Sequence, residues 1–95
     1  MNLEDLHTAE KPVSIVKMGH AEKAEIRAIK ILKNEVFAKH STTIPAVLYC
    51  VSGETVYESE DGEKHELKSG GFVNIPANVV HWLTAVQQSH LLLIK

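Results

Sequence analysis

The stretch that decides the fold is Gly70-Gly71-Phe72-Val73-Asn74-Ile75-Pro76-Ala77-Asn78-Val79-Val80-His81. It predicts a glycine turn, a short strand over residues 72–75, a proline-containing turn over 76–78 and a strand that begins at His81. Upstream, His40 precedes a second apolar run, residues 44–52, which Gly53 is expected to end. Two histidines therefore stand at the starts of two predicted strands, an arrangement that suits a small barrel with a site in its mouth.

The flanking sequence predicts more short strands, at residues 13–18, 24–33, 54–59, 63–67 and 90–94. Asn34-Glu35 predicts a turn, Asp61-Gly62 predicts a hairpin, and Gln87-Gln88-Ser89 is expected to turn between two strands. The segment after Pro12 is either an edge strand or a strand exchanged with a neighbouring subunit, and the polar first ten residues have room for one helical turn. About eight short strands with little helix indicate an all-β sandwich or barrel.

Composition sets limits on domain number and on function. A chain of 95 residues makes one domain, with residues 24–95 as the barrel and 1–23 as an extension that carries the edge strand. A net charge of −2 gives no basic face for nucleic acid, and the apolar run Leu91–Ile94 is far too short to cross a membrane. The polar start carries no signal segment, and the single cysteine, Cys50, fits a reducing compartment, so a cytoplasmic location is expected.

Two spaced motifs connect this pattern to a known family. The first motif occupies Asn34, His40, Thr42, Ala46 and Gly53, and the second occupies Gly70, Pro76, Asn78, His81 and Ala85. With this spacing, residues 24–95 resemble the cupin superfamily. The resemblance implies a double-stranded β-helix, or jelly-roll, barrel, and it implies a homodimer, because small cupins are commonly dimers.

The departures from the family pattern concern its metal site. Metal-binding cupins use three histidines and a glutamate, of which only His40 and His81 are present here. Thr42 replaces the second histidine and Ala46 replaces the glutamate, so we expect at most a weakly bound divalent metal on His40 and His81. Cys50 is a possible substitute ligand, although it is expected deeper in the barrel.

Alternation along the motif strand predicts a small, mostly apolar ligand pocket. Its expected lining is Ala46, Leu48, Cys50 and Leu83, with His40, Thr42 and His81 at the polar end and Tyr57 facing either the pocket or the solvent. Four of these residues also have a structural alternative: His40 as a turn histidine bonded to backbone, Thr42 as an ordinary strand residue, His81 as a satisfied core histidine, and Cys50 as a small buried apolar residue. The remaining histidines in polar surroundings, His7, His20 and His65, are expected to be solvated.

Three functions remain open at this stage. The first is a small-molecule binding or sensor module with a degenerate metal site. The second is a metal-dependent enzyme, of isomerase or oxygenase type, that uses the reduced His40/His81 ligand set. The third is a dimerisation or regulatory module without a ligand, and in each case we expect a homodimer that forms through a sheet face or an exchanged N-terminal strand.

Overall fold

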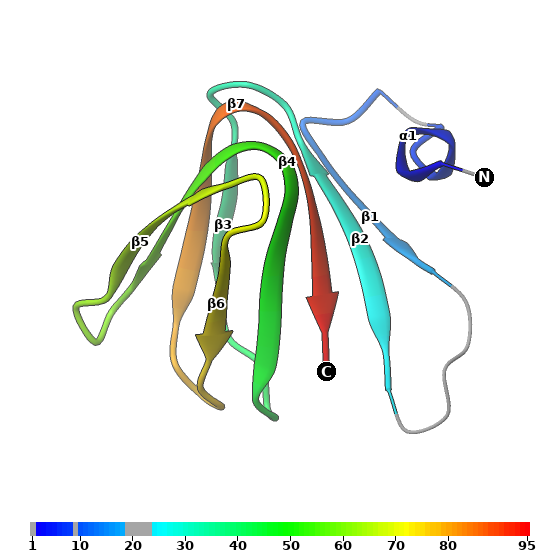
Figure 1. Ribbon diagram of the computed structural model, residues 1–95. Coiled ribbons are helices and arrows are strands. Elements are labelled where there is room, and N and C mark those ends of the chain that lie inside the picture. Colours follow the sequence, from blue (N-terminus) through cyan, green and yellow to red (C-terminus); the bar gives the residue numbers. More distant parts are fainter. Residues whose placement is uncertain (1, 9, 19–23) are drawn as a thin grey trace.

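A computed structural model describes residues 2–8, 10–18 and 24–95 of the chain (Figure 1). One short helix and seven strands occur in these residues: α1 (Leu3–Leu6), β1 (Val13–Lys17), β2 (Ile26–Ile31), β3 (Val36–His40), β4 (Ala46–Ser59), β5 (Lys64–Lys68), β6 (Phe72–Ile75) and β7 (His81–Ile94). All strand pairs among them are antiparallel. The prediction of an all-β fold is therefore confirmed. Within the described ranges, no helix has the length and apolar character needed to span a bilayer.

The two long strands, β4 and β7, build both layers of the barrel. The N-terminal half of β4 pairs with β6 and with the C-terminal half of β7, which in turn pairs with β2. The C-terminal half of β4 pairs with β5 and with the N-terminal half of β7, which in turn pairs with β3. Each long strand therefore passes from one layer to the other, as its curved path in Figure 1 shows.

A β-bulge at Gly53 lets β4 bend between the layers. Gly53 has φ +93°, and the β4–β7 register shifts on both sides of it. The Ser89 hydroxyl lies opposite the bulge, where it accepts a hydrogen bond from the Glu54 N–H at 3.0 Å. The predictions that Gly53 ends a strand and that residues 87–89 turn are therefore wrong, because the chain bends there without leaving the sheet.

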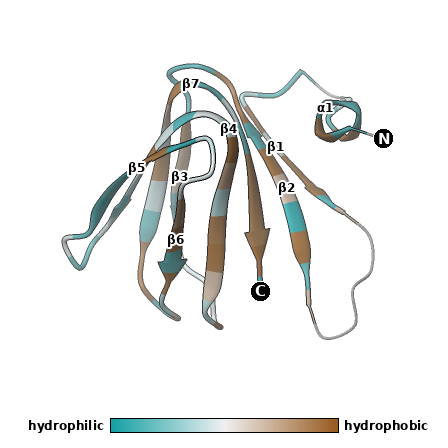
Figure 2. Ribbon diagram, in the orientation of Figure 1, coloured by the Kyte–Doolittle hydropathy of each residue, from teal (hydrophilic) through white to brown (hydrophobic). Residues whose placement is uncertain are grey.

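The core lies between the two layers. Its buried members come from β2, β4, β5, β6 and β7: Ile29, Ile31, Ala46, Leu48, Cys50, Tyr57, Leu67, Val73, Ile75, Leu83, Ala85, Leu91 and Leu93. Figure 2 shows that the C-terminal part of β7 is hydrophobic along its whole length, so this part presents apolar side chains to the outside as well as to the core.

The N-terminal segment folds back over the outside of β1, β2 and β7. The Glu4 carboxylate accepts hydrogen bonds from Lys30 Nζ and from His90 Nε2, both at 2.7 Å. His7 Nδ1 is 2.8 Å from the Ser14 hydroxyl, and His7 is only 7% exposed. The prediction that His7 is solvated is wrong, because its polar sequence neighbours gave no sign that this segment packs onto the sheet.

The other two histidines that were expected to be solvated have different outcomes. The side chain of His65 keeps 43% of its surface exposed. His20 lies outside the described residues.

Candidate functional site

His40 and His81 meet at one end of the barrel. They are register partners on β3 and β7, and Ser59 of β4 is the partner of His81 on its other side. The two ring centroids are 4.2 Å apart, with the rings edge to face at 65°. His81 is 1% exposed, whereas His40 is half-buried at the rim. A register shift in β3 between Phe37 and His40 aligns the histidines, because it moves His40 into the same cross-strand row as His81.

The next cross-strand row adds an aromatic wall to the histidine pair. Phe37, Leu83 and Tyr57 are successive register partners on β3, β7 and β4. The Phe37 ring stacks on His40 with centroids 4.1 Å apart and 17° between planes, and Tyr57 lies 5.5 Å from His81. The sequence patterns gave no indication of Phe37 or Ser59 as site residues. Ser59 could have been found by extending the alternation of β4 beyond Tyr57, but Phe37 is aligned by a bulge that has no sequence signature.

Both histidines are held by the same kind of backbone hydrogen bond. His40 Nδ1 lies 2.7 Å from the Ala38 carbonyl, and His81 Nδ1 lies 2.9 Å from the Val79 carbonyl. A carbonyl oxygen can only accept, so each Nδ1 carries the hydrogen and donates it. In the neutral ring, the Nε2 lone pair is not used by this backbone bond, so Nε2 can accept a hydrogen bond.

Burial favours the uncharged forms of three side chains in the interior. Desolvation lowers the pKa of His81 below its ordinary value of 6.5, and the nearby charge of His40 lowers it further, while the hydrogen bond to Val79 opposes both effects. Burial also raises the pKa values of the Tyr57 phenol and the Cys50 thiol. At neutral pH, the interior therefore holds an uncharged imidazole, an uncharged phenol and an uncharged thiol.

The residues at this site do not complete a metal-binding set. Thr42 and Ala46 stand where the family pattern has a histidine and a glutamate, and alanine offers no donor atom. The Thr42 hydroxyl donates to the Ile44 carbonyl at 2.8 Å, which ties it into the turn before β4. In the described part of the chain, no three His, Cys, Asp or Glu side chains are grouped so that they could hold a metal ion. Two imidazoles without a carboxylate do not fit a tightly held cation.

The structure divides the predicted pocket residues between the two layers. His40, His81, Tyr57 and Leu83 lie together in the layer of β3, β7, β4 and β5. The other strand residues of the prediction lie on the N-terminal half of β4, in the facing layer: Ala46, Leu48 and Cys50. All three are buried in the same core cluster as Tyr57 and Leu83, so Tyr57 faces the interior and not the solvent.

Comparison with known proteins agrees with the fold. No curated protein matches the sequence. Similar solved structures include a cupin superfamily protein from Desulfitobacterium hafniense, with 15% identity over 98% of this chain and 84% of that chain and a TM-score of 0.83. An RmlC-like cupin family protein with a double-stranded β-helix fold, from Methanocaldococcus jannaschii, has 24% identity over 93% and 82% of the two chains and a TM-score of 0.76. A conserved protein of unknown function from Streptococcus pyogenes has 21% identity over 90% and 75%, with a TM-score of 0.77.

At these identities, the likeness shows the fold alone, and it confirms the predicted double-stranded β-helix. The sequence pattern of the Cupin domain family itself matches residues 29–94, which is more than half of the chain. The protein therefore belongs to the cupin domain family.

Proposed function

We propose that this protein is a small-molecule binding cupin in which the Nε2 atoms of His40 and His81 bind the polar group of the ligand. The observation that carries the proposal is the pair of Nδ1 hydrogen bonds to the Ala38 and Val79 carbonyls. These bonds fix the orientation of both rings and assign Nε2 as the atom left for a ligand. A structural role alone does not require two rings in one cross-strand row whose Nδ1 atoms bond in the same way to backbone carbonyls.

The charge state of His81 selects the class of ligand. At neutral pH, a neutral His81 accepts a hydrogen bond at Nε2 but cannot offer one, because its only N–H is donated to Val79. Such a site favours a ligand that donates from a hydroxyl or an N–H group, and it disfavours a carboxylate. Phe37 and Tyr57 beside the pair favour a ligand with an apolar edge next to its donor group.

The first test measures the tautomers directly. Nitrogen-15 NMR of the imidazole rings should show that the neutral form of His40 and of His81 carries its hydrogen on Nδ1 and not on Nε2. A neutral ring that carries its hydrogen on Nε2 in either residue would remove the basis of the proposal, because the free atom would then be a donor.

The second test measures binding. Isothermal titration of metal-free protein against small alcohols, phenols and sugars, each paired with the carboxylic acid of similar shape, should show binding to the alcohol member only. His81→Ala should abolish this binding, and His90→Gln, which changes a histidine on the outside of the barrel, should leave it intact. Binding to none of the pairs, or equal binding in His81→Ala, would contradict the proposal.

A second candidate function is a metal-dependent enzyme with the reduced ligand set His40 and His81. Metal-binding histidines usually have one ring nitrogen held by a hydrogen bond so that the other can ligate, and both rings meet this condition. Elemental analysis of protein purified without added metal distinguishes the two candidates. A stoichiometric metal that is lost in His81→Ala would favour the enzyme, and a substoichiometric content that is unchanged in that variant would exclude it.

A further inference from the structure

Residues 2–8 lie on the outside of the sheet, and we call this segment, which contains α1, the N-terminal strap. No main-chain hydrogen bond joins the strap to a strand in the part of the chain that the structure describes, and no strap residue belongs to the core cluster. Within the same residues, three side-chain hydrogen bonds attach it: Glu4 to Lys30, Glu4 to His90 and His7 to Ser14. A helix of four residues has little stability of its own. The strap can therefore detach without breaking a strand ladder.

His7 is the buried titratable side chain of the strap, with 7% of its surface exposed. Its Nδ1 atom lies 2.8 Å from the Ser14 hydroxyl, and its Nε2 atom is buried with no hydrogen-bond partner among the described residues. A protonated ring carries a hydrogen on both nitrogens, and the Ser14 oxygen can accept only one of the two. The other N–H of the charged ring would stay buried without an acceptor, which costs more than an unpaired nitrogen of the neutral ring. The attached strap therefore favours a neutral His7.

The ionisable groups around His7 add to this effect. They lie on α1, on β2, on β7 and before β1: Glu4, Lys30, His90, Glu10 and Lys11. Lys30 carries a positive charge, and the ring centroids of His7 and His90 are 5.6 Å apart. Glu4 acts in the opposite direction, but its two oxygens already accept hydrogen bonds from Lys30 and His90. Burial, followed by the charges of His90 and Lys30, lowers the pKa of His7 below its ordinary value of 6.5.

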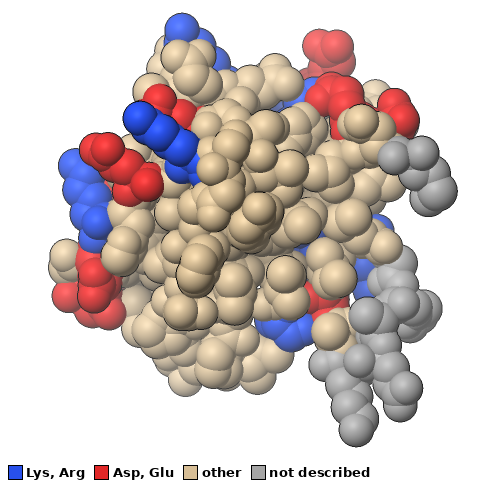
Figure 3. All heavy atoms as spheres, in the orientation of Figure 1, with Lys and Arg blue, Asp and Glu red and all other residues tan. Residues whose placement is uncertain are grey.

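The bonds of Glu4 hold the strap over the whole pH range in which histidine titrates. Lys30 and His90 are register partners on β2 and β7, and only 14% and 13% of their side-chain surface is exposed. Hydrogen bonds from Lys30 and His90 lower the pKa of Glu4, so its carboxylate is still mostly ionised at pH 5. Figure 3 shows acidic side chains at the upper right, the end of the molecule where Figure 1 places α1. A charge on His90 would strengthen its bond to Glu4, so loss of the strap in acid has to come from His7.

We propose that the N-terminal strap is released by acid: it lies on the sheet while His7 is neutral and detaches when His7 binds a proton. In the detached strap the ring is surrounded by water and binds a proton near pH 6.5, whereas the attached ring binds one only at lower pH. The attached form should therefore keep its full stability above pH 6.5 and lose it as the pH falls below that value. Release uncovers Lys30 and His90, and it does not depend on the ligand site at His40 and His81.

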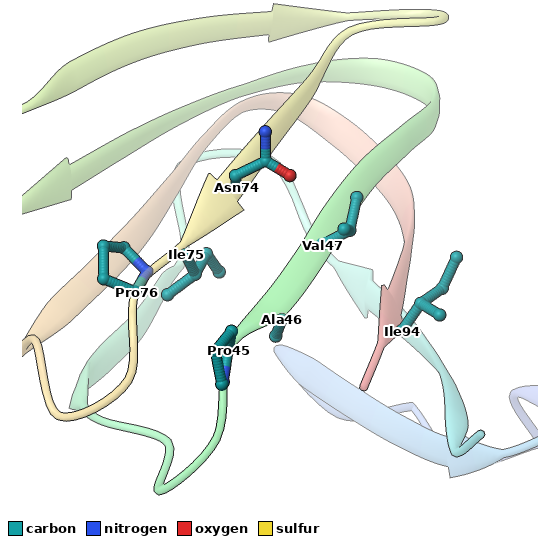
Figure 4. Close-up of a pocket in the computed structure, with 7 residues that line it drawn as sticks. All are labelled: Pro45, Ala46, Val47, Asn74, Ile75, Pro76 and Ile94. Carbon is teal, nitrogen blue, oxygen red and sulfur yellow. The ribbon is translucent and has the colours of Figure 1, made fainter. Parts of the chain in front are cut away.

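The test follows the strap and the barrel separately by NMR from pH 8 to pH 5. Nitrogen-15 shifts and heteronuclear NOEs of the strap amides should show an attached strap at pH 8. The ratio of detached to attached strap should rise by up to about 30-fold between pH 6.5 and pH 5, since one proton per release gives at most about tenfold per pH unit. Val47 and Ile94 report on the barrel, because they line a hollow that has no titratable side chain among its lining residues (Figure 4). Their signals should stay unchanged over the same range.

Two variants connect the release to His7. His7→Gln keeps a side chain that can bond to Ser14 but has no charge to gain, so its strap should stay attached at pH 5 as it does at pH 8. His65→Gln is the matched control, because it removes a histidine of β5 that has 43% of its side chain exposed. This control should release the strap as the wild-type protein does.

Three results would overturn the proposal: a wild-type strap that is equally attached at pH 8 and pH 5, a strap that is lost only together with the native signals of Val47 and Ile94, or a His7→Gln strap that detaches at pH 5 as in wild type. Should His7→Gln lack an attached strap even at pH 8, Glu4→Gln takes its place. This change weakens the attachment and removes the group that favours a charged His7, so release should move to higher pH. An unchanged midpoint would show the proposal to be wrong.

Discussion

Substitution of Gly53 by alanine should destabilise this fold more than the same change at any other glycine with positive φ in the described residues. Gly53, Gly62 and Gly70 have φ values of +93°, +93° and +88°, so a methyl group meets similar backbone strain at each, about 1–2 kcal/mol. The surroundings differ. A Cβ at Gly53 would lie 2.2 Å from the Gln88 carbonyl oxygen and 2.7 Å from Ser89 Cα, whereas Gly62 and Gly70 have no atom within 4 Å of the added carbon.

The close contacts at Gly53 involve the backbone of β7, which cannot rotate away as a side chain can. The two strands must separate at the bulge, and overpacking of this kind adds about 1–3 kcal/mol to the strain. Gly53→Ala should therefore lower the free energy of unfolding by about 2–5 kcal/mol, and Gly62→Ala and Gly70→Ala by about 1–2 kcal/mol. Urea unfolding followed by the fluorescence of the single tryptophan, Trp82, measures all three. A Gly53→Ala variant no less stable than the two controls would refute the account of the bulge.

Three further predictions follow from other contacts. Ser89→Ala removes the acceptor of the Glu54 N–H and should lower the unfolding free energy by about 1–2 kcal/mol in the same assay, whereas an unchanged value would show that the bulge does not need this bond. Burial lowers the pKa values of His81 and His7 in the folded state, so the unfolded chain binds protons more readily as the pH falls below 6.5. The free energy of unfolding should thus keep its full value above pH 6.5 and decrease below it. Denaturation measured from pH 8 to pH 5 should show a smaller decrease for His81→Phe than for the wild-type protein. Cys50 is fully buried and its thiol pKa is raised, so thiol reagents should modify it only after unfolding; rapid labelling of native protein would contradict this.

Sequence reasoning succeeded for features that depend on local patterns. The alternation of apolar residues placed Ala46, Leu48 and Cys50 on one buried face, and the two asparagines expected in turns, Asn34 and Asn78, both have positive φ. Motif spacing also brought His40 and His81 together, although they are 41 positions apart in the sequence.

Prediction from the sequence failed where the local structure depends on a partner strand far along the chain. A glycine with positive φ can end a strand or form a bulge inside one, and only the pairing of β4 with β7 decides between these outcomes at Gly53. The burial of His7 depends in the same way on Ser14 and His90, which lie on strands that the local sequence of His7 does not identify. The alignment of Phe37 with His40 depends on a bulge in β3, which is visible only against β7.

The position of β7 has a consequence for how the protein is made. This strand forms hydrogen-bonded ladders with β2, β3 and β4, although it follows all three of them in the chain and is therefore synthesised after them. While the nascent chain lacks residues 81–94, β3 has no partner within the described strands and β4 has only β5 and β6. Ribosome-bound chains should therefore stay sensitive to protease until these residues have left the exit tunnel, and the barrel should then close in one late step.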